Sequence, residues 1–199
     1  HGIGLLIIPR VNFGLMTLGR QMSTAALQDV SFRAPSMRDG AAIHALVKES
    51  GLDINSAYAY LAVMDHFRYT SLVAFDTRDD TGDDGELLGM LLGYRVPARP
   101  DTLFVWQVAV AERARGKGLA SHIITTLVQR NSGINYVEAT VTPSNVPSVA
   151  LFSGLGKHLN PARRAEIVCD VVEDHIPADS FPLDTVSYTH LRAHETEEN

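Results

Sequence analysis

The sequence of 199 residues contains one cysteine, Cys169, so no disulfide can form within the chain. A chain without cysteine pairs is typical of a reducing compartment, and we therefore expect the protein to work in the cytoplasm. The sequence also lacks an apolar run of roughly 18 residues, which is the length that a membrane-spanning helix needs. With an apolar fraction of 45% and a charged fraction of 20%, the chain has the composition of a soluble globular protein without a membrane partner.

Basic charge is also scarce. The chain has 17 lysines and arginines against 23 aspartates and glutamates, which gives a formal net charge of −6. This balance argues against nucleic acid and anionic membranes as general partners. Any basic site must therefore be local, and residues 113–117 stand out because they hold two arginines and a lysine.

The organisation of the chain indicates one domain. No internal repeat and no linker rich in proline, glycine and serine divides residues 31–183. Residues 1–30 are apolar but interrupted, and we expect them to be a leader outside the domain, with Met22 as a plausible start. Residues 184–199 show no apolar period and are expected to be a disordered or artefactual tail, so the last strand of the domain is expected to be missing.

Apolar periodicity and turn residues predict alternating strands and helices over this domain. Strands are expected at residues 31–34, 70–75, 87–94, 103–110, 136–142 and 165–172, and helices at residues 37–50, 57–67, 116–131 and 148–156. Several strands therefore precede a final βαβα unit. This order predicts an α/β fold with a mixed central sheet that is flanked by helices on both sides.

The most informative stretch is WQVAVAERARGKGLASHII, residues 106–124, where a strand pattern ends and a helix pattern begins. The start of a helix leaves backbone N–H groups unpaired and carries partial positive charge. Gly116 and Gly118 would let a ligand approach these groups, and Arg113, Arg115 and Lys117 next to them add full charge. The combination suits one phosphate, or two in a row. From composition alone, an exposed turn with ordinary surface charges explains the stretch equally well.

Two motifs distinguish these interpretations. RARGKG, residues 113–118, matches neither GxxxxGK[ST] nor GxGxxG, but it resembles the RxxGxG loop with which the GNAT superfamily of N-acetyltransferases binds the diphosphate of acyl-CoA. Downstream, NVPSVALF, residues 145–152, resembles the second CoA element of the same superfamily. Both motifs occur in the expected order, each on the expected structure, and together they indicate the GNAT fold.

A narrower resemblance extends over roughly residues 32–177. The segments GLDINSAY and RPDTLFVWQVAV are similar to the diaminobutyrate acetyltransferases of ectoine biosynthesis. This resemblance implies acetyl transfer from acetyl-CoA to the side-chain (γ) amine of L-2,4-diaminobutyrate, and it implies a homodimer. The two alternatives are a GNAT enzyme that acts on another small amine or amino acid, and a catalytically weak CoA-binding module.

The resemblance also implies where acetyl-CoA binds. We expect the diphosphate on the amides of residues 115–120, and the pantetheine arm along the end of the strand before them. Asn145 is expected to bond the pantetheine or a nearby carbonyl, although a plain helix-capping residue would suit this position as well. The expected acetyl-CoA contacts are Val108, Val110, Arg113, Arg115, Gly116, Lys117, Gly118, Leu119, Ala120, Asn145, Ser148 and Phe152.

The expected substrate contacts are fewer. Asp53 matches the substrate-side aspartate of the family and should hold an amine, although an ordinary loop role is commoner for such a residue. Tyr58 could close the pocket. Trp106, the only tryptophan, suits a core by composition, but the resemblance favours substrate contact. Glu138 and Thr140 alternate with apolar residues along a strand, and their side could face either the cleft or water.

The expected chemistry is direct attack of the amine on the thioester. The amine must first lose a proton, and a carboxylate beside it opposes that loss because it raises the pKa of the amine. We therefore expect Asp53 to orient the substrate and Glu138, or a chain of water molecules, to remove the proton. Amides of Val108 or Val110 would polarise the thioester carbonyl. Phe152 stands where many relatives have tyrosine, so it cannot protonate the leaving thiolate; Tyr58 is a candidate for that role.

Other patterns carry less weight. His190 and His194 have a spacing typical of metal ligands, but they lie in the suspect tail, so no metal site is expected. Cys169 lies in an apolar strand pattern, where we expect a buried, inert thiol and no nucleophile.

Overall fold

The computed structural model describes residues 8–12, 29–78, 85–141, 145–159 and 166–168. The chain divides into two compact units. The larger unit is Thr17–Ile134, and the smaller unit combines His1–Met16 with Asn135–Asn199. Among the described residues, no helix is both long and apolar enough to cross a membrane.

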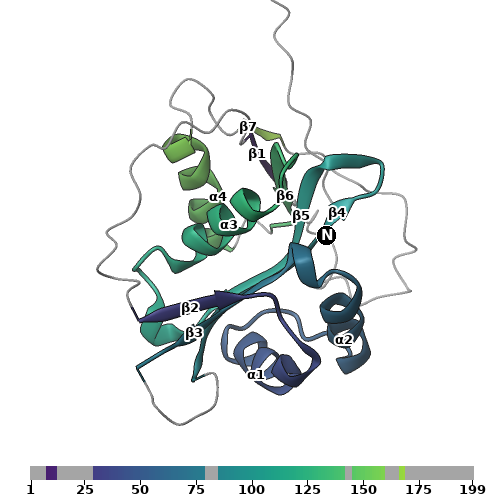
Figure 1. The fold of residues 1–199 in the computed structure, drawn as a ribbon. Helices are drawn as coiled ribbons and strands as arrows, with labels where there is room; N and C mark the ends of the chain where they lie inside the picture. Colours follow the sequence, from purple (N-terminus) through teal and green to yellow (C-terminus); the bar gives the residue numbers. More distant parts are fainter. Residues whose placement is uncertain (1–7, 13–28, 79–84, 142–144, 160–165, 169–199) are drawn as a thin grey trace, which may run out of the picture. The chain divides into compact units, whose positions relative to one another are not determined.

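The described residues of the larger unit contain four antiparallel strands in sequence order. They are β2 (Val30–Arg33), β3 (Leu72–Asp76), β4 (Leu87–Val96) and β5 (Arg99–Val110). Its helices are α1 (Gly40–Glu49), α2 (Ala57–His66) and α3 (Leu119–Arg130). Figure 1 shows α1 and α2 on one side of these strands and α3 on the other. This order of elements confirms the prediction from the sequence for this part of the chain.

Successive residues of β4 show how the strands separate the two layers of helices. A Cβ atom on Gly89 would lie 3.1 Å from Ile123 of α3, so this position faces α3. Met90, the next residue, belongs to a buried cluster with α1 and α2. Neighbouring residues of a strand point to opposite faces, so β4 is covered on both sides and its first seven residues are all buried.

The expected apolar faces of the helices are confirmed. Ile43, Leu46 and Val47 of α1 are all buried, and they pack in the cluster that contains Met90. On α3 the buried positions include Leu119, Ile123 and Leu127. In both helices the spacing of three and four residues places these side chains on one face, which is buried.

The start of α3 differs from the prediction. The helix begins at Leu119 and not at residue 116, because Gly116 and Gly118 have φ angles of +72° and +75°. These angles belong to the left-handed region, which glycine enters readily and which cannot continue a right-handed helix. Residues 115–118 therefore form a turn between β5 and the helix.

A bulge interrupts the pairing of β4 with β5. Leu92 pairs with Gln107, whereas the next residue, Gly93, pairs with Val105, so Trp106 is the extra residue on β5. Gly93 has no room for a side chain, since a Cβ atom there would lie 2.5 Å from the carbonyl oxygen of Phe104. Bulges locally redirect side chains, and this one lies in the strand that carries several of the expected site residues.

The smaller unit is built around a strand from the N-terminal part of the chain. β1 (Ile8–Asn12) pairs antiparallel with β6 (Tyr136–Ala139) and with β7 (Glu166–Val168), and α4 (Val146–Leu159) contacts β1. That residues 1–30 are a leader outside the domain stays a prediction. The expected tail, residues 184–199, and the absence of a last strand concern residues outside the described ones, as do Cys169, His190 and His194.

Candidate active site

The turn between β5 and α3 exposes backbone at the start of a helix. Gly116 is exposed, and among the described residues no heavy atom lies within 4 Å of the position that its Cβ atom would take. Gly118 is the N-cap of α3, and the amide of His122 donates to its carbonyl at 3.0 Å. The amides of residues 119–121 precede this first helical bond and have no acceptor within the helix. The geometry therefore suits an anion at this turn.

Two basic side chains fold back onto the same turn. Arg115 donates from Nε to the carbonyl of Val110 at 3.0 Å, and Lys117 donates from Nζ to the carbonyl of Arg113 at 3.0 Å. Both residues are exposed. Both charges are thus held at carbonyls of residues 110–113, in the segment before the helix, and each can add to the attraction of an anion.

Arg113 is held by carboxylates of the protein. Its guanidinium donates to Asp76 at 3.1 Å and pairs with Glu86 at 2.6 Å. Asp76 ends β3, and it also accepts hydrogen bonds from Nε of Arg78 at 2.9 Å and from the backbone amide of Arg78 at 3.1 Å. Two carboxylates thus partly compensate the charge of Arg113, and its expected contact with the diphosphate stays a prediction.

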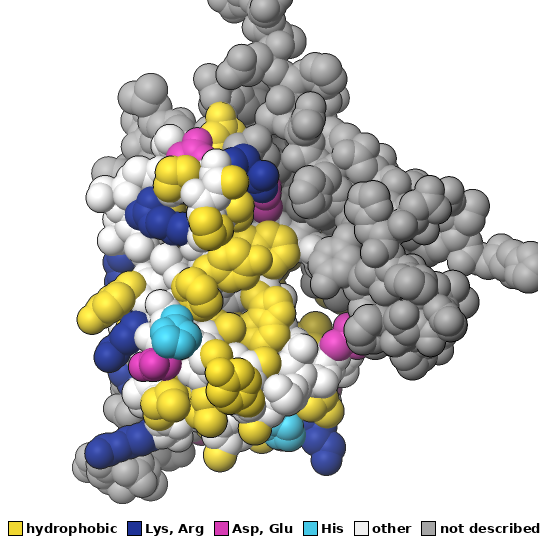
Figure 2. Space-filling view, turned by 90° about the vertical axis from the view of Figure 1, so that its right-hand side faces the viewer, with side chains coloured by type: hydrophobic (Ala, Val, Ile, Leu, Met, Phe, Trp, Pro, Cys, Tyr) yellow, Lys and Arg dark blue, Asp and Glu magenta, His cyan; other side chains and the backbone are white. Residues whose placement is uncertain are grey.

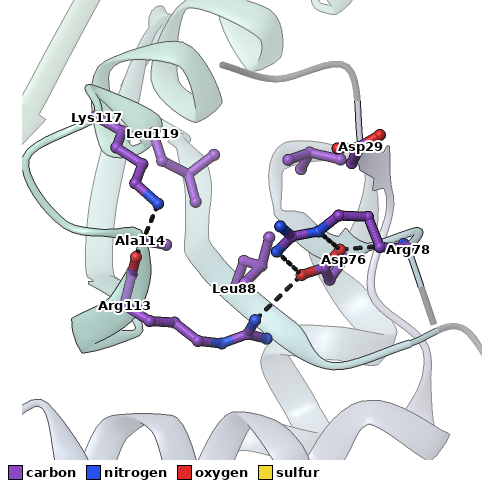
Figure 3. A pocket seen from close by; sticks show the side chains of 9 residues that line it. Asp29, Asp76, Arg78, Leu88, Arg113, Ala114, Lys117 and Leu119 are labelled. Atoms are coloured by element: carbon purple, nitrogen blue, oxygen red, sulfur yellow. Dashed lines mark hydrogen bonds and ion pairs between the residues drawn. The ribbon is translucent and has the colours of Figure 1, made fainter. Parts of the chain in front are cut away.

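Figure 3 shows these residues around a cavity of about 240 Å³ beside the turn. Arg113 and Arg78 reach the carboxylate of Asp76 from different sides, and Lys117 points to the carbonyl of Arg113. The lining residues are Asp29, Val30, Asp76, Arg78, Leu88, Arg113, Ala114, Lys117 and Leu119. Hydrogen bonds from the side chain and backbone of Arg78, and from Arg113, hold the pKa of Asp76 well below its usual range.

The expected substrate residue Asp53 lies in the loop between α1 and α2, where it is exposed. Two hydrogen bonds fix this loop to buried groups. The Nε2 atom of Gln107 donates to the carbonyl of Asp53 at 2.8 Å, and the amide of Asn55 donates to the hydroxyl of Tyr60 at 3.2 Å. The sequence prediction did not include Gln107, although a polar residue within an apolar strand is a signal that could have identified it.

Trp106 comes from the bulge of β5 to the same region. It is half-buried, packs against the cluster of α1 and α2, and has its ring 5.5 Å from the ring of Tyr60. The structure therefore brings Trp106 and the Asp53 loop together through Tyr60 and Gln107. Tyr58, by contrast, is 79% exposed, so its ring projects into solvent in this structure and does not cover a pocket.

The remaining strand residues are divided between exposed and buried positions. Glu138 is only 5% exposed, whereas Thr140 is exposed and lies just after β6, which ends at Ala139. The neighbours of Glu138, Val137 and Ala139, are also buried. Val108 and Val110 are half-buried and lie at the end of β5, which a short 3-10 helix (Glu112–Ala114) separates from the turn.

The second motif forms the start of α4. Asn145 accepts a hydrogen bond from the amide of Ser148 at 3.2 Å, so it caps the helix, as the simpler interpretation of the sequence had it. Ser148 is half-buried. Phe152 is 1% exposed, which places its ring in a packed interior. The first turn of α4 is thus more exposed than the position of Phe152, since Val146 is 67% exposed.

Comparisons with known proteins agree with these motifs. Residues 46–156 match the sequence model of the acetyltransferase (GNAT) family. The L-2,4-diaminobutyric acid acetyltransferase of Methylotuvimicrobium alcaliphilum is 43% identical over 148 residues, which cover 73% of this chain and 82% of that protein. The chain belongs to the GNAT family of acetyltransferases. The protein of the same name from Virgibacillus pantothenticus is 43% identical over 63% of this chain and 77% of its own.

Solved structures confirm the GNAT fold that was expected from the two motifs. Diaminobutyrate acetyltransferase EctA from Paenibacillus lautus, in complex with L-2,4-diaminobutyric acid and coenzyme A, is 38% identical with a TM-score of 0.56. The similarity covers 63% of this chain and 73% of EctA. Ard1 from Thermoplasma volcanium, at 15% identity and a TM-score of 0.55, shares the fold alone. This GNAT protein is therefore an α/β acetyltransferase.

The ion-pair cluster around Asp76 predicts a stability that depends on pH. Because the folded pKa of Asp76 is depressed, its contribution is present above the unfolded pKa of about 4 and is lost as the pH falls through lower values. Asp76→Asn should lower the urea midpoint at pH 7, and the difference from the parent should shrink as the pH falls below about 4. Equilibrium urea unfolding between pH 3 and 7 measures this.

Asp65→Asn is the matched control, since this aspartate on α2 has a side chain that is 67% exposed. Its midpoint should differ little from that of the parent at every pH. A difference for Asp76→Asn that stays constant down to pH 3 would show that the cluster does not depend on the charge of Asp76.

Proposed function

We propose that this acetyltransferase transfers the acetyl group of acetyl-CoA to the γ-amine of L-2,4-diaminobutyrate. The product is N4-acetyl-L-2,4-diaminobutyrate, the precursor of ectoine. The observation that carries the proposal is the identity of 43% with a protein named for this activity, over 82% of that protein's length. Its support in the structure is the Asp53 loop, which is held beside Trp106 by buried groups.

Acetyl-CoA is the acetyl donor in this proposal. Its diphosphate would bind the exposed amides between Gly116 and residue 121, with Arg115 and Lys117 turning from the backbone carbonyls that they now contact to the phosphate oxygens. Arg113 would remain paired with Asp76 and hold the turn in place. The pantetheine arm would lie along the residues of β5 that precede the turn.

The reaction needs a neutral amine and a polarised thioester. The γ-nitrogen attacks the carbonyl carbon, the carbon–sulfur bond breaks, and CoA leaves as a thiolate. Amides near Val108 would stabilise the negative charge on the carbonyl oxygen, and the proton of the amine would pass to Glu138 or to water. The thiolate can leave without a proton donor, because a thiol has a pKa of about 8.5. Phe152 in place of tyrosine is therefore compatible with turnover.

Asp53 is proposed to bind the amine that is not acetylated. A carboxylate favours the charged form of a nearby amine and raises its pKa. This effect would slow the reaction at the γ-nitrogen, but it is harmless at the α-ammonium, which stays charged throughout. The exposed carboxylate of Asp53 on a fixed loop is suited to this role, which makes it a specificity residue for diamino acids.

The single cysteine supports a cytoplasmic location for this enzyme.

Figure 2 shows hydrophobic side chains gathered on the face of the larger unit where α2 lies. The large apolar side chains of this unit that are exposed are Met37, Ile54, Tyr58, Phe67 and Tyr69. We propose that this face pairs with a second copy of the chain, because burying such a patch is favourable.

The substrate proposal predicts a clear order among amines. Diaminobutyrate should be acetylated with a kcat/KM about tenfold or more above that of ornithine, because one extra methylene is worth a factor of about 10 to 200. Asp53→Asn should lower kcat/KM for diaminobutyrate by about 10- to 100-fold, since it removes the negative charge that strengthens the hydrogen bond to the α-ammonium. Release of CoA measures the rates, and NMR of the product identifies the acetylated nitrogen.

Asp65→Asn again serves as the control and should keep the activity of the parent. A preference for ornithine or lysine would favour another small-amine substrate. Thermal stabilisation by CoA without turnover of any amine would instead favour a binding module.

The left-handed turn predicts a selective loss of acetyl-CoA affinity. Gly116→Ala should cost about 1 kcal/mol of stability, because alanine is strained at a φ of +72°. It should also raise the KM for acetyl-CoA by about tenfold, since one lost charge-assisted hydrogen bond is worth about 1.5 kcal/mol or more. Gly133→Ala is the matched control: its φ is +81° and the nearest side-chain atom to its Cβ position, on Arg95, is 3.9 Å away. The two variants should lose similar stability, and equal KM values would contradict the proposed diphosphate site.

The apolar face predicts a dimer. Light scattering coupled to gel filtration should give about twice the 21.7 kDa of one chain. The double variant Phe67→Ser, Tyr69→Ser should move the equilibrium to single chains, because their exposed rings contribute apolar area. Val146→Ser, which is 67% exposed in the smaller unit, is the control. A dimer that the double variant leaves intact would place the interface elsewhere.

A further inference from the structure

Gln107 is a buried polar residue beside the proposed active site. It is 9% exposed and lies on β5 directly after the bulge at Trp106. Its partner on β4, Leu92, belongs to the buried cluster of α1 and α2, so the side chain of Gln107 shares that face of the strand pair. The next residue, Val108, is the one whose amide is proposed to stabilise the thioester oxygen.

The two ends of the Gln107 amide have different environments. Nε2 donates to the carbonyl of Asp53 at 2.8 Å. Oε1 is also buried, and among the described residues it has no hydrogen-bond partner. The orientation of the amide is fixed by chemistry, because the Asp53 carbonyl can only accept and a reversed amide would place two acceptor oxygens against each other. The acceptor without a partner is therefore Oε1.

A buried acceptor without a partner is unfavourable, and proteins rarely keep one without a functional reason. Here the atom lies next to the loop that presents Asp53 and beside the strand that is proposed to hold the thioester. The substrate of the proposed reaction carries N–H donors on both of its nitrogens. An acceptor at this place is therefore suited to a donor that arrives with the substrate.

We propose that Oε1 of Gln107 accepts a hydrogen bond from the γ-nitrogen of diaminobutyrate and aims its lone pair at the thioester carbon. This inference rests on the proposed function. In this arrangement each nitrogen of the substrate has a different partner. The Asp53 carboxylate binds the α-ammonium, and the neutral amide of Gln107 orients the γ-nitrogen that reacts.

The division has a chemical reason. A carboxylate beside the reacting nitrogen would raise its pKa and hold the proton that must leave. An amide oxygen carries no net charge, so it orients the nitrogen in either protonation state with a smaller effect on that pKa. When the γ-nitrogen attacks, one N–H bond can remain on Oε1 while the other proton passes to the base. Gln107 would thus position the nucleophile without taking its proton.

The test compares three variants with the parent. Gln107→Met keeps the length of the side chain and removes both hydrogen bonds. Gln107→Glu keeps an acceptor, adds charge, and like Gln107→Met loses the donor to the Asp53 carbonyl. Tyr60→Phe is the matched control, because it removes the other tether of the same loop, the bond from the Asn55 amide to the Tyr60 hydroxyl at 3.2 Å, and places no acceptor near the substrate.

We expect Gln107→Met to lower kcat for diaminobutyrate about 10- to 100-fold, with little change in the KM for acetyl-CoA. Gln107→Glu should shift the acid limb of the pH profile of kcat/KM upward by about one unit or more, since a carboxylate would hold the proton of the reacting amine. Tyr60→Phe should raise the KM for diaminobutyrate a few-fold and leave both kcat and the pH profile as in the parent.

Two results would overturn the inference. The first is that Gln107→Met changes only the KM for diaminobutyrate, as is expected of Tyr60→Phe. Gln107 would then hold the Asp53 loop and have no role in orienting the γ-nitrogen. The other is Gln107→Glu that is folded by circular dichroism and has the pH profile of the parent. The Gln107→Glu profile decides the question even if Gln107→Met fails to fold.

Failure of the proposed function would appear separately, as a parent enzyme that prefers another amine. The same three variants are then compared on that preferred amine. A shifted Gln107→Glu profile there would support the role of Gln107, and an unshifted one would overturn it.

Discussion

The left-handed turn at Gly116 and Gly118 is the constraint on which the proposed chemistry depends. Positive φ angles stop a helix from forming at residue 116, and the amides before residue 122 have no acceptor within the helix. Glycine adopts such angles without steric strain because it has no Cβ atom. The protein then fixes the turn from one side with the Asp76–Arg113 pair, so the flexible residues lie in an anchored segment. The proposed anion site therefore depends first on backbone geometry and only then on side-chain charge.

Much of the fold could be predicted from periodicity. The spacing of apolar residues in α1 and α3 follows from the helix period. An apolar helix face must be buried whichever strand it covers, so the sequence alone identifies the buried side chains. For this reason Ile43 and Ile123 are both buried as expected. The first residue of α3 could not be predicted from this spacing, because the spacing of apolar residues carries no information on the φ angles of Gly116 and Gly118. Similarly, the alternation around Glu138 did not predict its burial, which depends on neighbours distant in sequence.

The candidate site could be predicted only where its motif is local. The motif at residues 113–118 is one contiguous segment, and the exposed backbone at Gly116 agrees with it. Gln107 and Asp53 are 54 positions apart, and their contact exists only after the helices pack on the strands. Arg113 was expected near a phosphate because its motif resembles the RxxGxG loop, but the sequence did not show that Asp76 and Glu86 would pair with it. Pairing of this kind is set by tertiary structure and has no local signal.

The position of β1 has a consequence for the order of assembly. The larger unit is one continuous segment, Thr17–Ile134, and all its strands can pair once the ribosome has released that stretch. The smaller unit cannot, because β1 pairs with β6 and β7 from the other end of the chain. Contacts so distant in sequence close a long loop and form slowly. Residues 8–12 therefore cannot form their strand pairs until most of the chain has been synthesised. The unit that contains Glu138 is thus completed last.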